Sequence, residues 1–508
     1  MSSTVQNPNA EAPAKSSVDA DVSTNSDSMA GSVVKGAAWA TMANIARIAS
    51  AIFVLPVLAR FLSPDDFGIV QIGMPVVLFL MMFNDFGFGP ALVRAKSVSK
   101  QAWTSVFWIN VAVGATLTAI IYFLSAPVAG WFNQPRAEPI LQVLSFTVIL
   151  NCLTITPAAK LQRQMRFDLL SMVEVFSIGA GIAVAIFSAI QGYGAWSLVF
   201  QQVVMFSLKT ILMWLLARPP IAPIISVDEL REMFGFSSNM MLTRVVNFVS
   251  RNADNIIIGR ILGAAALGYY SIAYRILLLP VEVFAWGLSQ VLMPAMSTFQ
   301  ENKGRMRAAT LRTYRLISLC TFPAMAGVSL LAEPLIIVVL GERMAPAAAI
   351  LQIIAPVGAI QSLGSTQGAM YMALGRADIL FRLSLIGMAA SVIGFQVGVN
   401  WGLEGVATAY LVLCVSLSPF SFIPLMRLIK MSLGDIIGAL KTPFLATLLM
   451  AGTVLALKFI PVVAELPNLG KLVFLSSVGA VTYVGLCVLL DRKLVKEVLG
   501  LISDIKSR

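Results

Sequence analysis

Histidine is absent from the 508 residues of this chain, and cysteine occurs only four times. The cysteines lie far apart, each in an apolar segment, so the short ligand spacing of a zinc site is missing. Without histidine, the most common general acid and base is missing as well. We therefore expect no metal and no cofactor. The four cysteines should be small buried side chains: Cys152, Cys320, Cys414 and Cys487.

Charged residues are scarce, at 12%, whereas hydrophobic residues make up 58% of the chain and the mean hydropathy is +0.85. A soluble domain could not cover its surface with so few polar groups. Apolar runs long enough to cross a bilayer recur along almost the whole chain, and none resembles a short cleavable signal. The composition predicts an all-α polytopic membrane protein.

Motifs for energy-driven or catalytic chemistry are also missing. No P-loop is present, so ATP does not drive this chain directly. The segments between apolar runs on the predicted outer face are too short for the catalytic loop that a membrane glycosyltransferase or polymerase needs. We therefore expect that the protein is not an enzyme.

The apolar runs predict about fourteen transmembrane helices. Because this number is even, both ends of the chain should lie on the same side of the membrane. The segments are 36–61, 67–90, 103–124, 139–159, 169–190, 193–216, 236–259, 267–298, 311–340, 346–374, 379–400, 403–426, 440–461 and 471–490.

The distribution of positive charge predicts the orientation. The net charge is +11, and 26 Lys and Arg side chains fall on the face that includes both termini. By the positive-inside rule both termini are cytoplasmic, so the charge indicates topology and no nucleic-acid partner is expected. The opposite face holds only Arg60, Arg136, Arg260, Arg343, Lys458 and Lys471, and four arginines fall within spans: Arg47, Arg244, Arg251 and Arg275.

Two stretches that are 200 residues apart indicate an internal repeat. "ARFLSPDDFG" at 59–68 shares an arginine, a leucine and a glycine with "GRILGAAALG" at 259–268, in the same order. Later matches keep a similar offset: Pro90-Ala91 with Pro294-Ala295, Arg166 and Asp168 with Arg376 and Asp378, and Gly192 with Gly402. The pattern predicts two parallel six-helix repeats, with substrate bound between them near the middle of the membrane.

These observations divide the chain into six parts. Residues 1–30 have almost no large apolar side chains, so they cannot bury enough surface to become ordered. Residues 491–508 place apolar side chains at helical spacing among basic ones, which is typical of an interfacial helix. The predicted parts are a disordered cytoplasmic tail (1–30), an N-terminal six-helix bundle (31–216), a cytoplasmic inter-lobe linker (217–235), a C-terminal six-helix bundle (236–430), two additional transmembrane helices (431–490) and a cytoplasmic amphipathic tail (491–508).

The seventh predicted span carries an unusual set of polar residues. Arg244, Asn247, Arg251, Asp254 and Asn255 fall on one stripe of a helix, at about 100° per residue. An arginine that faces lipid costs about 2.5–3.5 kcal/mol, so the stripe should face a water-filled interior.

Two interpretations of the intramembrane arginines remain open. In the first, Arg251 pairs with Asp254 and Arg275 with Glu282, and the pairs only fix helix packing. In the second, Arg47 from the first bundle joins those of the second bundle in a cationic cavity for an anionic substrate. Guanidinium groups suit that role because their planar fork matches phosphate oxygens and stays charged.

The intramembrane carboxylates are candidates for ion coupling. A carboxylate at membrane depth can couple transport to protons or Na⁺, although a role as salt-bridge partner or helix cap stays open for each. The candidates are Asp85, Glu174, Asp254 and Glu282.

Four stretches resemble the Wzx-type polysaccharide exporters of the MOP superfamily, in particular the colanic acid exporter branch. The resemblance is a pattern over about residues 31–430, with no single diagnostic site. The stretches are "GAAWATMANIARIASAIFVLPVLARFLSPDDFGIV", "NDFGFGPALVRAK", "NADNIIIGRILGAAALGYYSIAYRI" and "LMPAMSTFQENKGRMR".

The resemblance implies a V-shaped flippase in the bacterial inner membrane. It would move undecaprenyl-pyrophosphate-linked oligosaccharides to the periplasmic leaflet by alternating access, with polysaccharide polymerase and co-polymerase proteins as partners. Cationic cavity residues would then bind the pyrophosphate and sugars. The positions in this chain that could do so are Arg47, Arg244, Asn247, Arg251, Asn255 and Arg275.

Two alternatives are a small-molecule antiporter like the MATE drug exporters, and a polymerase or ligase acting on the same lipid-linked glycan. The first favours an acidic cavity, and the second needs long outer loops.

Overall fold

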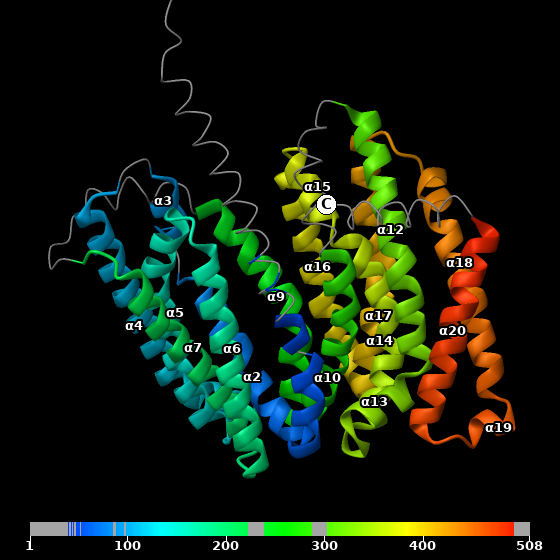
Figure 1. The fold of residues 1–508 in the computed structure, drawn as a ribbon, viewed down its shortest axis with the longest axis horizontal. Helices are drawn as coiled ribbons and strands as arrows, with labels where there is room; N and C mark the ends of the chain where they lie inside the picture. Colours follow the sequence, from blue (N-terminus) through cyan, green and yellow to red (C-terminus); the bar gives the residue numbers. More distant parts are fainter. Residues whose placement is uncertain are drawn as a thin grey trace, which may run out of the picture.

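The computed structural model describes residues 39, 42, 44, 47–50, 52–84, 88–95, 98–221, 238–286 and 302–491, and within 238–286 it describes side chains from 245 to 284. In these residues every regular element is a helix, which confirms the all-α prediction (Figure 1). The predicted tail 1–30 lies outside the described residues, as do 222–235 of the linker and 492–508 of the C-terminal tail.

The helices follow the apolar segments of the sequence. Residues 52–61 are helical, and they are followed by α2 (Pro64–Met81), α3 (Phe88–Arg94), α4 (Lys100–Trp131), α5 (Ala137–Arg163), α6 (Phe167–Ile190) and α7 (Trp196–Ala217). The second half contains α9 (Ser238–Ile261), α10 (Ala264–Pro280), η1 (Val281–Trp286), α12 (Lys303–Leu330), α13 (Ala332–Leu340), η2 (Glu342–Met344), α14 (Ala347–Gly364), α15 (Gln367–Ala373), α16 (Ala377–Gly398), η3 (Val399–Trp401) and α17 (Gly402–Leu428). The chain continues through α18 (Leu433–Lys458), α19 (Pro461–Ala464) and α20 (Asn468–Leu490).

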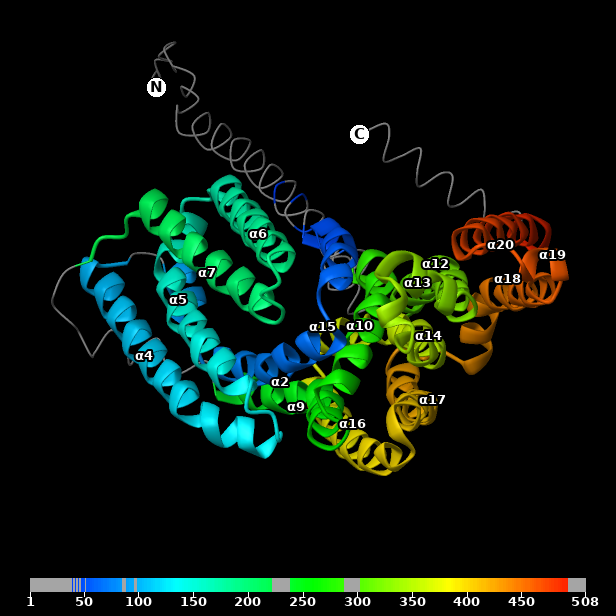
Figure 2. The same cartoon turned by 90° about the horizontal axis from the view of Figure 1, so that it is seen from below.

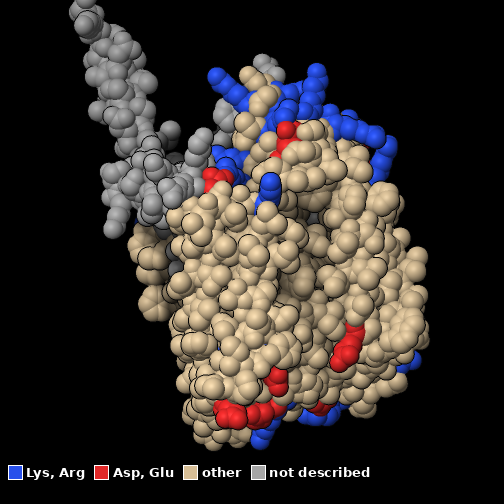
Figure 3. Space-filling view, turned by 90° about the vertical axis from the view of Figure 1, so that its right-hand side faces the viewer, with Lys and Arg blue, Asp and Glu red and all other residues tan. Residues whose placement is uncertain are grey.

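Many of these helices can cross a membrane. Ten spans in the described residues are long and apolar enough, or eleven if α12 and α13, bent by 81°, count as one. In Figure 3 charged side chains gather at the two ends of the molecule, and the broad band between them is nearly free of charge. The protein is therefore a multi-pass membrane protein, while the predicted number of fourteen spans stays a prediction.

The cysteines only partly follow the expectation of burial. Cys152 and Cys487 are buried and Cys414 is half-buried, but Cys320 on α12 is exposed. The physical reason is that the outer surface of a membrane protein faces hydrocarbon, so an apolar side chain gains little by turning inward.

The helices form two groups and an appended pair. In the first group α4 packs on α5, α5 on α7, and α6 on α7; in the second, α14 lies between α12 and α17, and α16 packs on α9 and α17. The appended α18 and α20 pack on each other, and α18 also packs along α12 (Figure 2). In Figure 1 helices α4 to α7 lean away from the second group toward the top of the view, so the molecule has the outline of a V.

The two groups meet where α2 and α10 begin. A Cβ atom at Gly68 would lie 1.7 Å from the carbonyl oxygen of Ala264, and one at Gly268 would lie 1.9 Å from that of Pro64. Only glycine allows backbones to approach this closely. The contact is reciprocal, because positions 64 and 68 exchange roles with 264 and 268. We call this contact the closed end.

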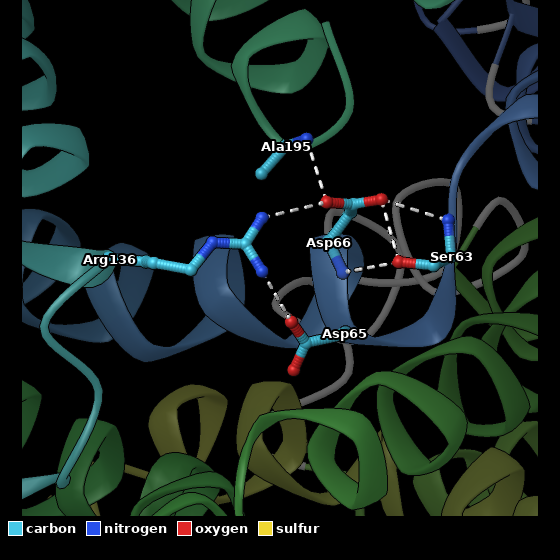
Figure 4. Close-up of polar contacts among 5 residues, drawn as sticks. All are labelled: Ser63, Asp65, Asp66, Arg136 and Ala195. Carbon is cyan, nitrogen blue, oxygen red and sulfur yellow. Dashed lines mark hydrogen bonds and ion pairs between the residues drawn. The ribbon is translucent and has the colours of Figure 1, made fainter. Parts of the chain in front are cut away.

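Asp66 joins three loops of the first group at the closed end (Figure 4). Its carboxylate accepts hydrogen bonds from the backbone N–H of Ser63 (2.9 Å) and from that of Ala195 (3.1 Å), and it lies 3.5 Å from the Arg136 guanidinium. Arg136 also donates to Asp65 at 2.9 Å. The capping box of Ser63 and Asp66 begins α2, so one side chain fixes the start of α2 and the turns before α5 and α7.

A second paired feature lies at the opposite end of the helices. The Arg166 side chain donates to Asp168 at the start of α6 (3.1 Å from Nε), and the Arg376 side chain donates to Asp378 at the start of α16 (2.9 Å from Nε). The same short motif therefore begins one helix in each half.

Candidate functional site

A cavity of about 430 Å³ lies between the two groups of helices. Its walls come from residues 47–58, α2, α6 and α7 of the first half and from α10 of the second. Its polar lining consists of Arg47, Ser50, Gln71, Gln201, Gln202, Ser271, Tyr274 and Arg275. None of the described lining residues is acidic, so the cavity is cationic.

Helical spacing explains why these side chains share the cavity. On α2 the lining residues are Phe67, Val70, Gln71 and Met74, and on α7 they are Leu198, Gln201, Gln202 and Met205. Both sets follow the spacing i, i+3, i+4 and i+7, which places them on one face of the helix. Each helix therefore presents a single stripe to the cavity.

The two arginines come from different halves of the molecule. Arg47 is exposed, and its Nη2 donates to the Asn44 side chain at 2.6 Å. Arg275 is also exposed, and no ion pair is formed by it among the described residues. The cavity therefore holds two guanidinium groups that form no salt bridge in that part of the chain, although the Glu282 carboxylate is near enough to Arg275 to interact with it electrostatically.

The structure does not bring the rest of the predicted cationic set to this cavity. Asn247 and Arg251 are exposed on α9, and Asn255 is half-buried with its backbone N–H on the Asp254 carboxylate at 2.8 Å. None of these three lines the cavity. The Arg244 side chain lies outside the described residues.

The internal ion pairs considered from the sequence are not formed. Among the described residues, no salt bridge joins Arg251 to Asp254 or Arg275 to Glu282.

Asp254 is the most buried of the three coupling candidates that the structure describes, with 5% of its surface exposed. The Tyr270 hydroxyl donates to it at 2.9 Å, and the Tyr270 ring stacks on Tyr274 at 6.1 Å between ring centres. The Tyr274 hydroxyl lies 3.4 Å from that of Tyr410, to which Gln361 donates. Because Tyr274 also lines the cavity, one hydrogen bond and one ring-stacking contact connect the buried carboxylate with the cavity wall.

The other carboxylates occupy different surroundings. Glu174 is half-buried on α6, one turn before the cavity residue Ile178, and Glu282 is half-buried in η1. Asp85 lies outside the described residues.

Sequence reasoning missed the three glutamines of the cavity. Gln71, Gln201 and Gln202 lie in apolar helices, which is the same signal that identified the arginines. The predicted amides, Asn247 and Asn255, were recognised because they lie beside arginines on one helix, whereas the three glutamines have no charged residue next to them on their helical face.

Comparison with known proteins decides the family. Residues 57–349, more than half of the chain, match the family described as "Polysaccharide biosynthesis protein". The chain belongs to this family. The membership confirms the resemblance to polysaccharide exporters stated from the sequence.

Individual relatives agree with this assignment. The chain is 24% identical to the lipopolysaccharide biosynthesis protein WzxC of Escherichia coli over 74% of this chain and 77% of that protein. It is 26% identical to the succinoglycan biosynthesis transport protein ExoT of Rhizobium meliloti, over 94% and 97%. The fold is similar to that of the lipid II flippase MurJ in an inward closed conformation, with a TM-score of 0.73, 14% identity, and coverage of 91% of this chain and 100% of that one.

Proposed function

We propose that this protein flips undecaprenyl-pyrophosphate-linked oligosaccharide repeat units from the cytoplasmic to the periplasmic leaflet of the bacterial inner membrane, for exopolysaccharide or capsule assembly. The observation that carries the proposal is the cavity between the halves, to which Arg47 and Arg275 contribute one guanidinium each. Membership of the polysaccharide biosynthesis protein family supports it.

The chemistry of the cavity suits a diphosphate. Guanidinium groups stay charged when partly desolvated and bind phosphate oxygens through two parallel hydrogen bonds. The cavity of about 430 Å³ is within the usual range for small-ligand sites, so it can hold a diphosphate and part of a glycan while the lipid tail remains outside.

Transport would proceed by alternating access between two parallel repeats. The reciprocal glycine contact of the closed end and the paired Arg–Asp motifs support the repeat. The positive-inside rule assigns the closed end, which carries Arg60, Arg136 and Arg260, to the periplasm. The cavity would then open toward the cytoplasm, where the substrate is made.

Asp254 is the best candidate for coupling to an ion gradient. A buried carboxylate is costly to keep charged, so its protonation or its binding of Na⁺ can change which conformation is stable. Its hydrogen bond with Tyr270, and the stacking of Tyr270 on Tyr274, offer a route by which this change reaches the cavity. The flipping rate in proteoliposomes tests this coupling. A rate that changes with neither a proton gradient nor a Na⁺ gradient would contradict the coupling but not the transport proposal.

The rival functions receive less support. A drug antiporter for cationic compounds would need acidic groups where this cavity has Arg47 and Arg275. A polymerase or ligase would need longer outer loops than the sequence provides, and polysaccharide polymerase and co-polymerase proteins are instead proposed as partners.

Reconstituted protein tests the function directly. Proteoliposomes would contain the lipid-linked repeat unit extracted from cells that lack this chain, and a glycan-modifying reagent would be added outside. The measured quantity is the rate at which the glycan's accessibility to the external reagent changes. We expect this rate to be at least tenfold higher in vesicles that contain the purified protein than in protein-free vesicles. Equal rates with and without protein, in vesicles of proven tightness, would contradict the proposal.

A further inference from the structure

The cations and the amides of the cavity lie at different distances from the closed end, measured along their helices. At 1.5 Å per residue, Gln71 lies about 10 Å along α2 from its start at the closed end, and Gln201 and Gln202 lie about 8–9 Å along α7. Arg275 lies about 16 Å along α10 from the same end. Arg47 precedes the helical residues 52–61, which lead into α2 at the closed end. It therefore lies farther from the closed end than Arg275 does.

All three amides belong to the first half of the molecule and face free space. Each is half-buried, and none of the three side chains forms a hydrogen bond with another described residue. An amide that is shielded from water and has no hydrogen-bond partner is unfavourable. For packing alone, an aliphatic side chain of similar size would serve equally well. The amides therefore need water or a ligand as their partner.

Packing between α6 and α7 fixes the position of the amides on α7. A Cβ atom at Gly181 would lie 2.8 Å from the carbonyl oxygen of Gln201 and 3.5 Å from its Cγ. Glycine at this position lets the two helices approach closely, so α7 has little freedom to rotate. The stripe that carries Gln201 and Gln202 is thereby held toward the cavity.

The chemistry of an amide differs from that of a guanidinium. A glutamine side chain offers two donors and one acceptor, whereas a guanidinium has donors only. Sugar hydroxyls both donate and accept, so they match amides, while a diphosphate only accepts and matches the arginines. The two groups of side chains therefore suit different parts of one lipid-linked glycan.

We propose that Gln71, Gln201 and Gln202 form the sugar-binding subsite, which lies between the arginines and the closed end. Resting on the proposed function, this assigns the orientation of the substrate: the glycan enters first and the diphosphate stays behind it at Arg47 and Arg275. The three glutamines then determine which repeat units are accepted.

Methionine substitutions test the subsite because methionine keeps the length of glutamine and removes its amide. The probes are undecaprenyl pyrophosphate without sugar and the lipid-linked repeat unit from cells that lack this chain. We expect the triple variant Gln71→Met, Gln201→Met, Gln202→Met to bind the repeat unit about tenfold or more weakly, since each hydrogen bond contributes a few-fold. Its affinity for undecaprenyl pyrophosphate should change less than about twofold.

Two controls make the outcome decisive. Gln396→Met changes an exposed glutamine on α16 that does not line the cavity, so it should leave both affinities unchanged. If the triple variant does not fold, the single variant Gln202→Met replaces it. Thermal unfolding checks that the single variant is folded. Equal weakening for both probes, or no weakening, would overturn the subsite. If the unaltered protein binds neither probe, the proposed function itself fails.

Discussion

At the scale of single residues, the arginines of the cavity differ from the arginines that form ion pairs elsewhere in the molecule. Arg136, Arg307 and Arg376 each pair with an aspartate, whereas Arg275 forms no salt bridge in the described residues. An ion pair between exposed side chains contributes little to stability because water screens both charges. In a confined cavity, however, a guanidinium that no salt bridge neutralises attracts an anion strongly, and this gives Arg275 its proposed role.

We predict that Arg275→Ala weakens binding of undecaprenyl pyrophosphate by about 10- to 100-fold, since a hydrogen bond to a charged group contributes about 1.5–3 kcal/mol. Arg275→Lys should recover only part of the loss, because lysine lacks the planar fork. Affinity measured in detergent or nanodiscs checks this. The control is Arg382→Ala, an exposed arginine on α16; an equal effect there would show a general charge effect instead.

Arg251 is a separate case because it lies outside the cavity. The sequence-based prediction stands that Arg251→Ala, at normal expression, abolishes polymer export while lipid-linked precursor accumulates inside the cell. The cost of a charged side chain at membrane depth is the reason to expect a function for it. Quantification of polymer and precursor in a complemented deletion strain tests this, and unaltered export would remove Arg251 from the mechanism.

Asp254 gives the residue-scale prediction for coupling. Asp254→Asn keeps a side-chain oxygen for the Tyr270 hydroxyl but removes the titratable charge. We expect flipping in proteoliposomes to lose its response to an imposed ion gradient, while substrate affinity changes less than about threefold. The matched control is Asp378→Asn, an exposed acid paired with Arg376. A gradient response that survives in Asp254→Asn would exclude this carboxylate.

At the scale of helices, glycine positions decide how closely the two halves meet. Gly68 and Gly268 bring the starts of α2 and α10 into backbone contact, and these were the glycines shared by the repeated stretches at 59–68 and 259–268. We predict that Gly68→Val keeps the halves apart at this crossing, because its Cβ alone would overlap the Ala264 carbonyl.

A reporter cysteine can measure this effect. In a background without the four native cysteines, Ser271→Cys places a thiol in the cavity. With Gly68→Val, we expect an impermeant maleimide added on the periplasmic side to label it several-fold faster. Gly130→Val is the matched control, because no atom lies within 4 Å of a Cβ there. Labelling that is unchanged by Gly68→Val would show that this contact does not close the cavity.

The positions of the helices along the sequence were easier to predict than the face that each helix turns toward the cavity. The apolar segments placed α4 to α7 and α14 to α20 because apolar length is a local property. The rotation of each helix depends on its neighbours, which no single segment reveals. The stripe on α9 was therefore correctly recognised as polar but does not line the cavity, whereas Gln201 and Gln202 on α7 do.

At the scale of the whole molecule, the two halves also touch through the ends of α4 and α9. The Arg260 guanidinium lies 5.5 Å from the ring centre of Trp131, and a Cβ at Gly259 would lie 3.1 Å from the Phe132 ring. Together with the α2–α10 crossing, these contacts close one end of the V. Alternating access requires all of them to part, so linking the halves here should stop transport.

We predict that a thiol-reactive cross-link between Trp131→Cys and Arg260→Cys reduces flipping in proteoliposomes to the protein-free rate, and that cleavage of the linker restores it. The control pair, Asp65→Cys and Arg136→Cys, lies within the first half, where the native side chains are 2.9 Å apart. A cross-link there joins parts of one rigid group and should leave most of the activity. If the molecule linked at Trp131 and Arg260 still flips its substrate, the halves do not need to separate at this end, and the cavity must release the glycan by another route.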